Sequence, residues 1–146
     1  AILKGYAFFP KNLESFRSYG FVLNTVDQII KLQKIDIKKI NKKTLYLCDY
    51  EPLKLDDFAK KIQMISKSPK VKYLSLKLFF ILAKFGDLLK KVGINFFPIT
   101  TFRLNNILTS STFDTTLLKE ICGPQIYDID EGINITLDWI KAMKNK

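Results

Sequence analysis

The sequence predicts an α+β lobe that is mostly helical, with a few short strands. Three observations lead to this prediction. Apolar residues recur with helical periodicity in most segments, and several of these segments stop at a glycine or a proline. Runs with β-propensity are short, and they are too few for a sheet of their own. The length of 146 residues favours one domain, residues 1–146, with room for a real core.

The N-terminal part alternates short extended pieces with a first helix. Tyr6 to Phe9 is aromatic and reads as a short strand, and Ser18 to Leu23 is a second extended piece. Asn24 is predicted to cap a helix, because Asp27 follows three residues later as in a capping box. The apolar residues that share one face of this helix are Val22, Val26, Ile29 and Ile30.

The middle of the chain predicts two strands and two helices. Thr44 to Cys48 is β-rich and is predicted to be a strand with both faces covered. An amphipathic helix follows and ends near Ser66. Val71 to Leu74 fits a short strand. Leu76 to Val92 is a long, mostly apolar helix that we expect Gly86 to interrupt.

The C-terminal part predicts three more helices. Pro98 is placed at the first turn of one of them. Asp114 is the expected N-cap of a helix over Thr115 to Ile121. Asp128 and Glu131 match a second capping box, which opens the final helix.

The net charge of +10 comes almost entirely from lysine, because Arg17 and Arg103 are the only arginines among 24 basic residues. Proteins that read nucleic acid usually rely on arginine for bidentate contacts. We therefore interpret the lysines mainly as solvated faces and expect no nucleic-acid partner. No membrane partner is expected either, since the longest uninterrupted apolar run, Leu78 to Ala83, is far too short to span a bilayer.

The chain lacks the residues that several kinds of catalytic and binding site require. Histidine is absent, which excludes catalytic triads and dyads that use it as the base. Cys48 and Cys122 lie 74 positions apart, without metal-ligand spacing, so no metal site is expected. No glycine pair is close enough for a phosphate-binding loop or a dinucleotide fingerprint. We therefore expect no catalytic residue and no bound cofactor within this chain.

Two Tyr-x-x-x-Lys matches, at Tyr50 to Lys54 and Tyr73 to Lys77, are interpreted as coincidence. A chain with six tyrosines and this much lysine produces roughly one such match by chance. Pro52 also disrupts the helical turn that would align the first pair.

Arg17 lies in the segment Arg17-Ser-Tyr-Gly-Phe-Val-Leu-Asn24, between predicted ordered elements. An arginine in such a setting suits fork-shaped recognition of a phosphate or a carboxylate better than a solvated lysine does. The alternative is that Arg17 is one more surface charge.

Four ordered segments resemble the C-terminal half of an extended short-chain dehydrogenase, the NAD-dependent epimerase/dehydratase family acting on nucleotide sugars. The Arg17 segment resembles the family's Arg-Asp-aromatic-x-Tyr-Val-x-Asp. Thr44 to Asp49 followed by Leu55-Asp-Asp-Phe58 resembles its strand and following helix. The other two matches are Arg103 followed by Phe113-Asp114 and Leu118 to Gly123, and Tyr127-Asp-Ile-Asp-Glu-Gly132 continuing to Trp139.

The resemblance implies a division of labour. In this family an N-terminal Rossmann half binds NAD or NADP and carries the catalytic Tyr and Lys, and the C-terminal lobe grips the nucleotide part of the sugar nucleotide. Two arginines typically clamp the diphosphate, and they match Arg17 and Arg103. A strand before the first arginine typically packs on the base, which by position implies Ala7 and Phe9. For Phe9, an ordinary core role is an equal alternative.

On this interpretation the chain is a fragment of a longer cytoplasmic enzyme whose Rossmann half is missing, and its partner is a nucleotide-diphosphate sugar. The sequence departs from the family at Ser18, Asn24 and Asn105-Asn106, where the family has acidic or Gly-Asp residues. The alternative function is a basic non-catalytic module that binds nucleic acid or an anionic membrane surface.

Overall fold

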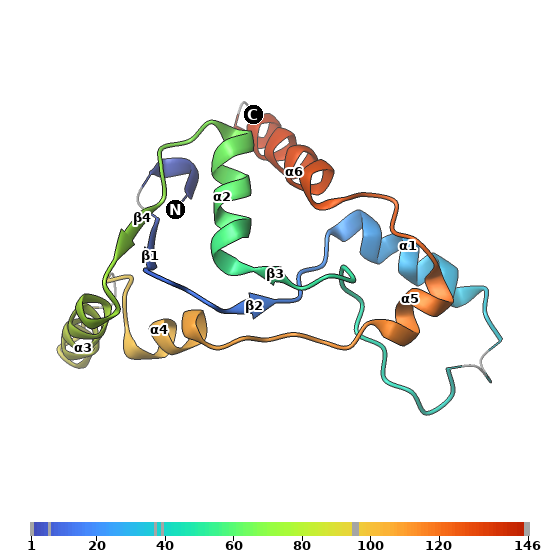
Figure 1. Ribbon diagram of the computed structural model, residues 1–146, viewed down its shortest axis with the longest axis horizontal. Helices are drawn as coiled ribbons and strands as arrows, with labels where there is room; N and C mark the ends of the chain where they lie inside the picture. The colour runs from blue at the N-terminus through green and yellow to red at the C-terminus, as the bar shows by residue number, and fades with distance from the viewer. Residues whose placement is uncertain (1, 6, 37, 39, 95–96, 145–146) are drawn as a thin grey trace. The chain divides into compact units, whose positions relative to one another are not determined.

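The computed structural model describes residues 2–5, 7–36, 38, 40–94 and 97–144. It is a small α+β protein, mostly helical with a few short strands, as the sequence predicts (Figure 1). The chain groups into two compact units. The first contains residues 1–16 and 54–111, and the second contains residues 17–53 and 112–146.

The elements follow one another in chain order. The helices are η1 (Ile2–Lys4), α1 (Val22–Gln33), α2 (Leu55–Ser66), α3 (Leu76–Lys91), α4 (Thr101–Leu108), α5 (Thr116–Cys122) and α6 (Ile129–Lys144). The strands are β1 (Phe8–Pro10), β2 (Phe16–Arg17), β3 (Leu53–Lys54) and β4 (Lys72–Leu74). They form two two-stranded sheets, in which β1 pairs with β4 and β2 pairs with β3.

The first unit is built on the pairing of β1 with β4 and on the packing of α3 against α4. The two strands run parallel, with Phe9 opposite Tyr73 in the register. Phe79 and Ala83 of α3 form a buried cluster with Leu104 of α4. Figure 1 shows α3 and α4 side by side at the end of the strand pair. Burial of this apolar cluster joins the two helices.

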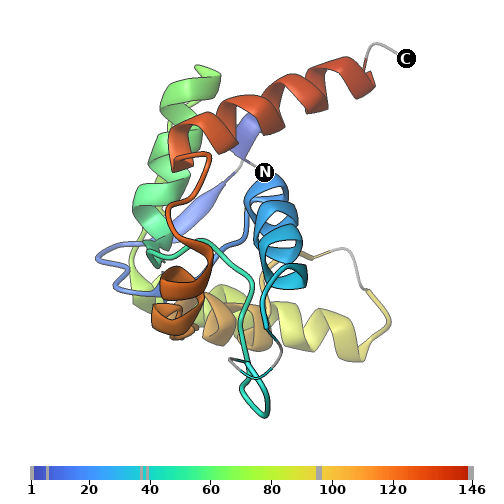
Figure 2. The same ribbon diagram turned by 90° about the vertical axis from the view of Figure 1, so that its right-hand side faces the viewer.

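The second unit packs α1 against α5 (Figure 2). Its buried cluster contains Tyr50, Leu118 and Cys122. Unusually, α1 turns polar residues inward, since the buried residues of this helix are Asn24 and Gln28. The apolar face that the periodicity identifies is the exposed one: Val22, Val26, Ile29 and Ile30 are all exposed, and so is the neighbouring Leu23.

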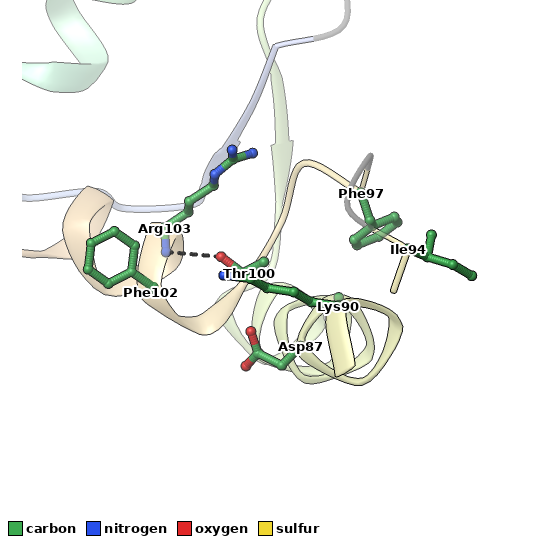
Figure 3. Close-up of a pocket in the computed structure, with 8 residues that line it drawn as sticks. Asp87, Lys90, Ile94, Phe97, Thr100, Phe102 and Arg103 are labelled. Atoms are coloured by element: carbon green, nitrogen blue, oxygen red, sulfur yellow. Dashed lines mark hydrogen bonds between the residues drawn. The ribbon is translucent and has the colours of Figure 1, made fainter. Parts of the chain in front are cut away.

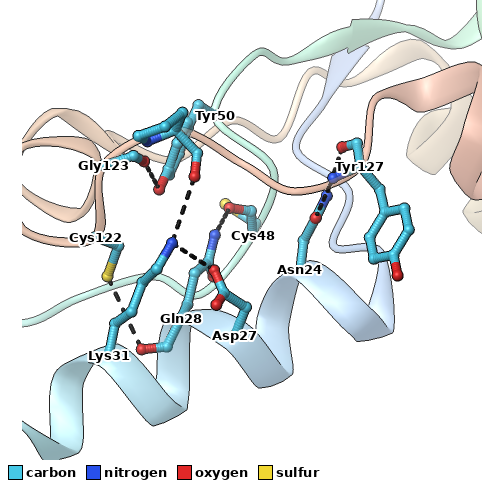
Figure 4. Close-up of polar contacts among 10 residues, drawn as sticks. Asn24, Asp27, Gln28, Lys31, Cys48, Tyr50, Cys122, Gly123 and Tyr127 are labelled. Carbon is cyan, nitrogen blue, oxygen red and sulfur yellow. Dashed lines mark hydrogen bonds and ion pairs between the residues drawn. The ribbon is translucent and has the colours of Figure 1, made fainter.

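A hydrogen-bond network holds the buried polar face of α1 in place (Figure 4). The Asn24 amide donates to Asp49 Oδ1 and to the Tyr127 carbonyl, and its oxygen accepts the Tyr127 backbone N–H. Gln28 Nε2 donates to the Cys48 carbonyl at 2.9 Å. Buried polar groups cost stability unless they are paired, so these bonds fix how α1 sits against the loops around Asp49 and Tyr127.

Three predictions about this second unit are wrong. The extended piece predicted over Ser18 to Leu23 is displaced, because the strand is Phe16–Arg17 and Val22 and Leu23 already belong to α1. Helix α1 begins at Val22 with Phe21 as its N-cap, so Asn24 lies inside the helix, where its side chain serves the network described above. Residues 44–48 form no strand, although all five are described. The Cys48 carbonyl accepts from Gln28 instead of from a neighbouring strand. A β-prone run without a partner strand cannot form a ladder.

Other boundaries shift by a few residues. Helix α3 continues through Gly86 without a break. Helix α4 starts after Thr100, three residues later than a helix opened by Pro98 would, because the Thr100 hydroxyl provides the cap. Thr115 rather than Asp114 is the N-cap of α5, although Asp114 still accepts the Thr116 N–H at 2.9 Å.

Several other element predictions are confirmed, and β1 covers Phe8–Pro10 where the sequence predicts Tyr6 to Phe9, of which Tyr6 lies outside the described residues. Helix α2 and strand β4 form where the sequence places them. Asp128 and Glu131 form the reciprocal capping box, with each backbone N–H donating to the other's carboxylate. Gly123 ends α5 at a φ of 68°, a left-handed conformation that favours glycine.

Candidate functional site

The candidate site lies in the first unit, where α3 and α4 meet. The backbone before α4 crosses α3 at Gly86. A Cβ at this position would lie 1.9 Å from the Ile99 carbonyl oxygen, far inside van der Waals contact. Only glycine therefore allows residues 97–100 to pass this close to α3. This approach brings the start of α4 against the C-terminal half of α3.

Two side chains satisfy the first turn of α4. The Thr100 hydroxyl accepts the Arg103 backbone N–H at 3.3 Å. Asp87, which comes from α3, accepts the Thr101 N–H at 3.2 Å. Both bonds use N–H groups that have no partner inside the helix, and the Asp87 charge lies at the positive end of the helix dipole. The caps fix Arg103 in the first turn, beside α3.

An open pocket of about 320 Å³ lies at this junction (Figure 3). The residues that line it are Gly86, Asp87, Lys90, Ile94, Phe97, Thr100, Phe102 and Arg103. Arg103 Nη1 donates to the Pro98 carbonyl at 3.0 Å, which tethers one side of the guanidinium. In Figure 3 the guanidinium points away from Asp87. The pocket thus places Arg103 and Lys90 around one opening, with a carboxylate that is already engaged by a backbone N–H.

The residue types of this pocket suit an anion that is joined to a flat ring. A guanidinium presents five N–H donors in a planar fork, of which one is used by Pro98. Lys90 adds a second positive charge. Phe102 is 73% exposed and Phe97 is half-buried, so each has accessible ring surface. Nucleobases stack on such aromatic rings, and phosphates pair with arginine forks.

The other predicted site residues are distributed over both units. Ala7 is buried and its carbonyl accepts the Lys72 N–H. Phe9 is half-buried in β1, within the same unit as Arg103. Arg17 lies on β2 in the second unit and is half-buried. Because Arg17 and Arg103 belong to different units, a joint clamp by the two arginines stays a prediction.

Arg17 has an electrostatic effect on a neighbouring tyrosine in its own unit. Burial raises the pKa of Tyr19 above its usual value, and the Arg17 charge partly opposes this rise by favouring the phenolate.

Sequence reasoning missed Lys90 and Phe97 as pocket residues. Their contribution depends on the close crossing at Gly86, a tertiary contact. The one signal in the sequence was a glycine inside an apolar helix, which often marks close packing rather than a break.

The two Tyr-x-x-x-Lys pairs have other partners. Burial, together with a hydrogen bond to Asp56, raises the pKa of Tyr73 to about 12. The Tyr50 hydroxyl donates to the Gly123 carbonyl at 2.7 Å, and burial raises its pKa as well. A tyrosine that acts as a base needs a lowered pKa, so neither environment suits that role.

No family model, curated protein or solved structure matches this chain. Among the described residues, no group of three or more Cys, Asp and Glu side chains could hold a metal ion. Within the same residues, no helix is both long and apolar enough to cross a bilayer.

Proposed function

We propose that this chain is the substrate-binding lobe of an NAD(P)-dependent nucleotide-sugar epimerase or dehydratase. In this proposal Arg103 and its pocket bind the diphosphate of the nucleotide sugar. A Rossmann half supplies NAD or NADP and the catalytic Tyr and Lys. The full-length enzyme oxidises a sugar hydroxyl by hydride transfer and rearranges the ketone that results. The chain described here binds substrate and is not catalytic by itself.

The observation that carries the proposal is the position of Arg103. It is one of two arginines in the chain, and it lines a pocket together with Lys90 and exposed aromatic surface. A diphosphate carries charge on several oxygens that an arginine fork and an ammonium group can share. The aromatic side chains of the pocket provide surface for the base or the sugar.

The exposed apolar face of α1 also supports a lobe within a larger protein. Val22, Val26 and Ile30 are each more than two-fifths exposed, although they lie on one face of a regular helix. An apolar helix face of this kind is normally covered by another protein surface. In the proposal, the Rossmann half provides that cover.

Calorimetry with a series of nucleoside diphosphates tests the proposal on the full 146-residue chain. We expect Arg103→Ala to weaken binding roughly tenfold to a hundredfold, since charge-assisted hydrogen bonds are lost. Arg103→Lys should fall between the wild type and alanine, because it keeps the charge but loses the fork. The clamp further predicts that Arg17→Ala weakens binding to a similar extent.

Lys84→Ala is the matched control, because it removes one positive charge from α3 outside the pocket. Its affinity should equal that of the wild type. The proposal fails if the correctly folded wild-type chain binds none of the nucleoside diphosphates. It also fails if Lys84→Ala and Arg103→Ala weaken binding equally, since that result would indicate a general effect of charge.

A further inference from the structure

The outer face of α3 combines an exposed apolar stripe with a row of lysines. The stripe contains Leu78, Ile81, Phe85, Leu88 and Val92, which are 39%, 65%, 51%, 58% and 66% exposed. These residues follow one another at alternating spacings of three and four, so they form a continuous line along the helix. The opposite face of α3 is buried through Phe79, Ala83 and Gly86. The stripe is therefore additional to the apolar surface that packs against α4.

The lysine row runs beside the stripe. Lys77, Lys84 and Lys91 are exposed and each immediately precedes a member of the stripe, seven residues apart. They lie along one edge of the apolar line. In α3, all of whose residues are described, the one acidic residue is Asp87, and its carboxylate accepts the Thr101 N–H at the pocket. The outer face thus presents apolar side chains and positive charge.

The charge of the whole first unit has the same sign. Its sequence contains 13 lysines and arginines but only four acidic residues, which gives a net charge of +9. The second unit, with 11 basic and 10 acidic residues, accounts for the remaining +1. Almost all of the excess positive charge is therefore on the unit that carries the stripe.

We propose that the outer face of α3 lies on an anionic phospholipid surface. The apolar stripe enters the boundary between headgroups and acyl chains, and the lysine row reaches the lipid phosphates. An amphipathic helix with lysines flanking large apolar residues lies in the membrane plane for this reason. The earlier expectation of no membrane partner rested on the absence of a spanning segment, and surface contact needs none.

Two other occupants fit the face less well. In an antiparallel pair of α3 helices from two copies, the lysine rows would face each other and repel. In a parallel pair Lys77 would face Leu82 and Lys84 would face Leu89, so neither lysine would pair with an opposite charge. A missing part of the same enzyme would need an acidic edge to match the lysines, whereas an anionic bilayer provides negative charge everywhere.

Sedimentation of the full chain with vesicles tests the proposal. We expect binding to vesicles of equal parts phosphatidylcholine and phosphatidylglycerol, with little binding to pure phosphatidylcholine. Replacing all three lysines of the row with glutamine should weaken partition into the anionic vesicles on the order of a hundredfold, which is about fivefold per lysine. Ile81→Ser with Leu88→Ser should also abolish most binding. These two positions are preferred over Phe85, whose ring contacts Phe97 at the pocket.

The matched control replaces Lys4, Lys11 and Lys70 with glutamine, three exposed lysines of the same unit that lie outside α3. It makes the same change in net charge and should retain most of the binding. Circular dichroism confirms that each variant is folded. Equal losses in the two triple variants would overturn the proposal, and so would a folded wild type that ignores anionic vesicles.

Sedimentation velocity without lipid tests whether a second copy of the chain covers the stripe. If the wild type is a dimer that Ile81→Ser with Leu88→Ser converts to a monomer, the stripe is a protein interface and the proposal is wrong. A wild type that stays monomeric without lipid supports it. Nucleoside-diphosphate affinity should be unchanged in all these variants, so this proposal and the proposed function can fail separately.

Discussion

Asn24 offers the sharpest test of how the second unit is held together. Its side chain is 2% exposed and makes three hydrogen bonds, two as donor and one as acceptor. Two of the bonds reach Tyr127, 103 positions along the chain, and the third reaches the carboxylate of Asp49. Asn24→Ala removes all three bonds and leaves partly buried polar groups without their partner.

The expected cost follows from the number of bonds. At about 1 kcal/mol for each bond, Asn24→Ala should lower the free energy of unfolding by about 3 kcal/mol. A small domain is stable by only about 5–15 kcal/mol, so this loss is easily measured. The better helix propensity of alanine returns only a few tenths of a kcal/mol.

Asn24→Asp tests the direction in which stability changes with pH. It keeps the acceptor for the Tyr127 N–H but places a second carboxylate 2.9 Å from Asp49 Oδ1, where the amide nitrogen now lies. Two carboxylates this close cannot both ionise without cost, so one of them has a raised pKa in the folded state. A raised folded-state pKa means that stability falls as pH rises above the unfolded value of about 3.9. The variant should therefore be closest to wild type near pH 4 and most destabilised at neutral pH.

Urea unfolding followed by circular dichroism measures both effects. Asn134→Ala is the matched control, because Asn134 is exposed and its amide donates to the Asp130 carbonyl within the same helix, α6. That control should stay within about 0.5 kcal/mol of wild type. The reasoning is refuted if Asn24→Ala is no more destabilising than Asn134→Ala. It is also refuted if the difference in free energy of unfolding between Asn24→Asp and the wild type does not decrease as the pH is lowered.

Two further predictions concern the first unit. Gly86→Ala should destabilise the chain by about 2 kcal/mol despite the better helix propensity of alanine, because the new Cβ meets the Ile99 carbonyl; thermal unfolding measures this, and a stabilised variant would contradict the close crossing. Tyr73→Phe should cost about 1 kcal/mol at neutral pH through loss of the bond to Asp56, and the difference from wild type should vanish as pH rises from about 10 towards 12. Ultraviolet titration should show that this variant lacks the tyrosinate of highest pKa, and an unchanged titration would contradict it.

Local sequence rules placed the helices closely, whereas the strand predicted at residues 44–48 does not form. The difference has a physical reason. Helix periodicity and capping are local, so α2 and the Asp128–Glu131 capping box follow directly from the sequence. A strand is stable only with a partner, and β-propensity within residues 44–48 carries no information about one.

The candidate site was predictable only in part. The expectation for Arg103 came from the resemblance to the epimerase/dehydratase family, and the rarity of arginine in this chain strengthened it. Lys90 could not be distinguished from the other lysines, since its place at the pocket depends on the crossing at Gly86. The orientation of α1 was likewise hidden. Buried amides at Asn24 and Gln28 are stable only because loops distant in sequence supply their hydrogen bonds.

The chain exposes apolar faces on α1 and α3, and the charges around them differ. Within α1, all of whose residues are described, the charged side chains are Asp27 and Lys31, which pair with each other at 2.6 Å, so the helix itself has no net charge. An apolar helix face without excess charge is best covered by a protein surface that has apolar side chains of its own. On α3 the apolar stripe runs beside unbalanced lysines, which a protein interface would have to neutralise at a desolvation cost. An anionic bilayer allows those lysines to stay hydrated at the headgroups while the stripe is buried. We therefore propose different covers for the two faces, a protein domain for α1 and a lipid surface for α3.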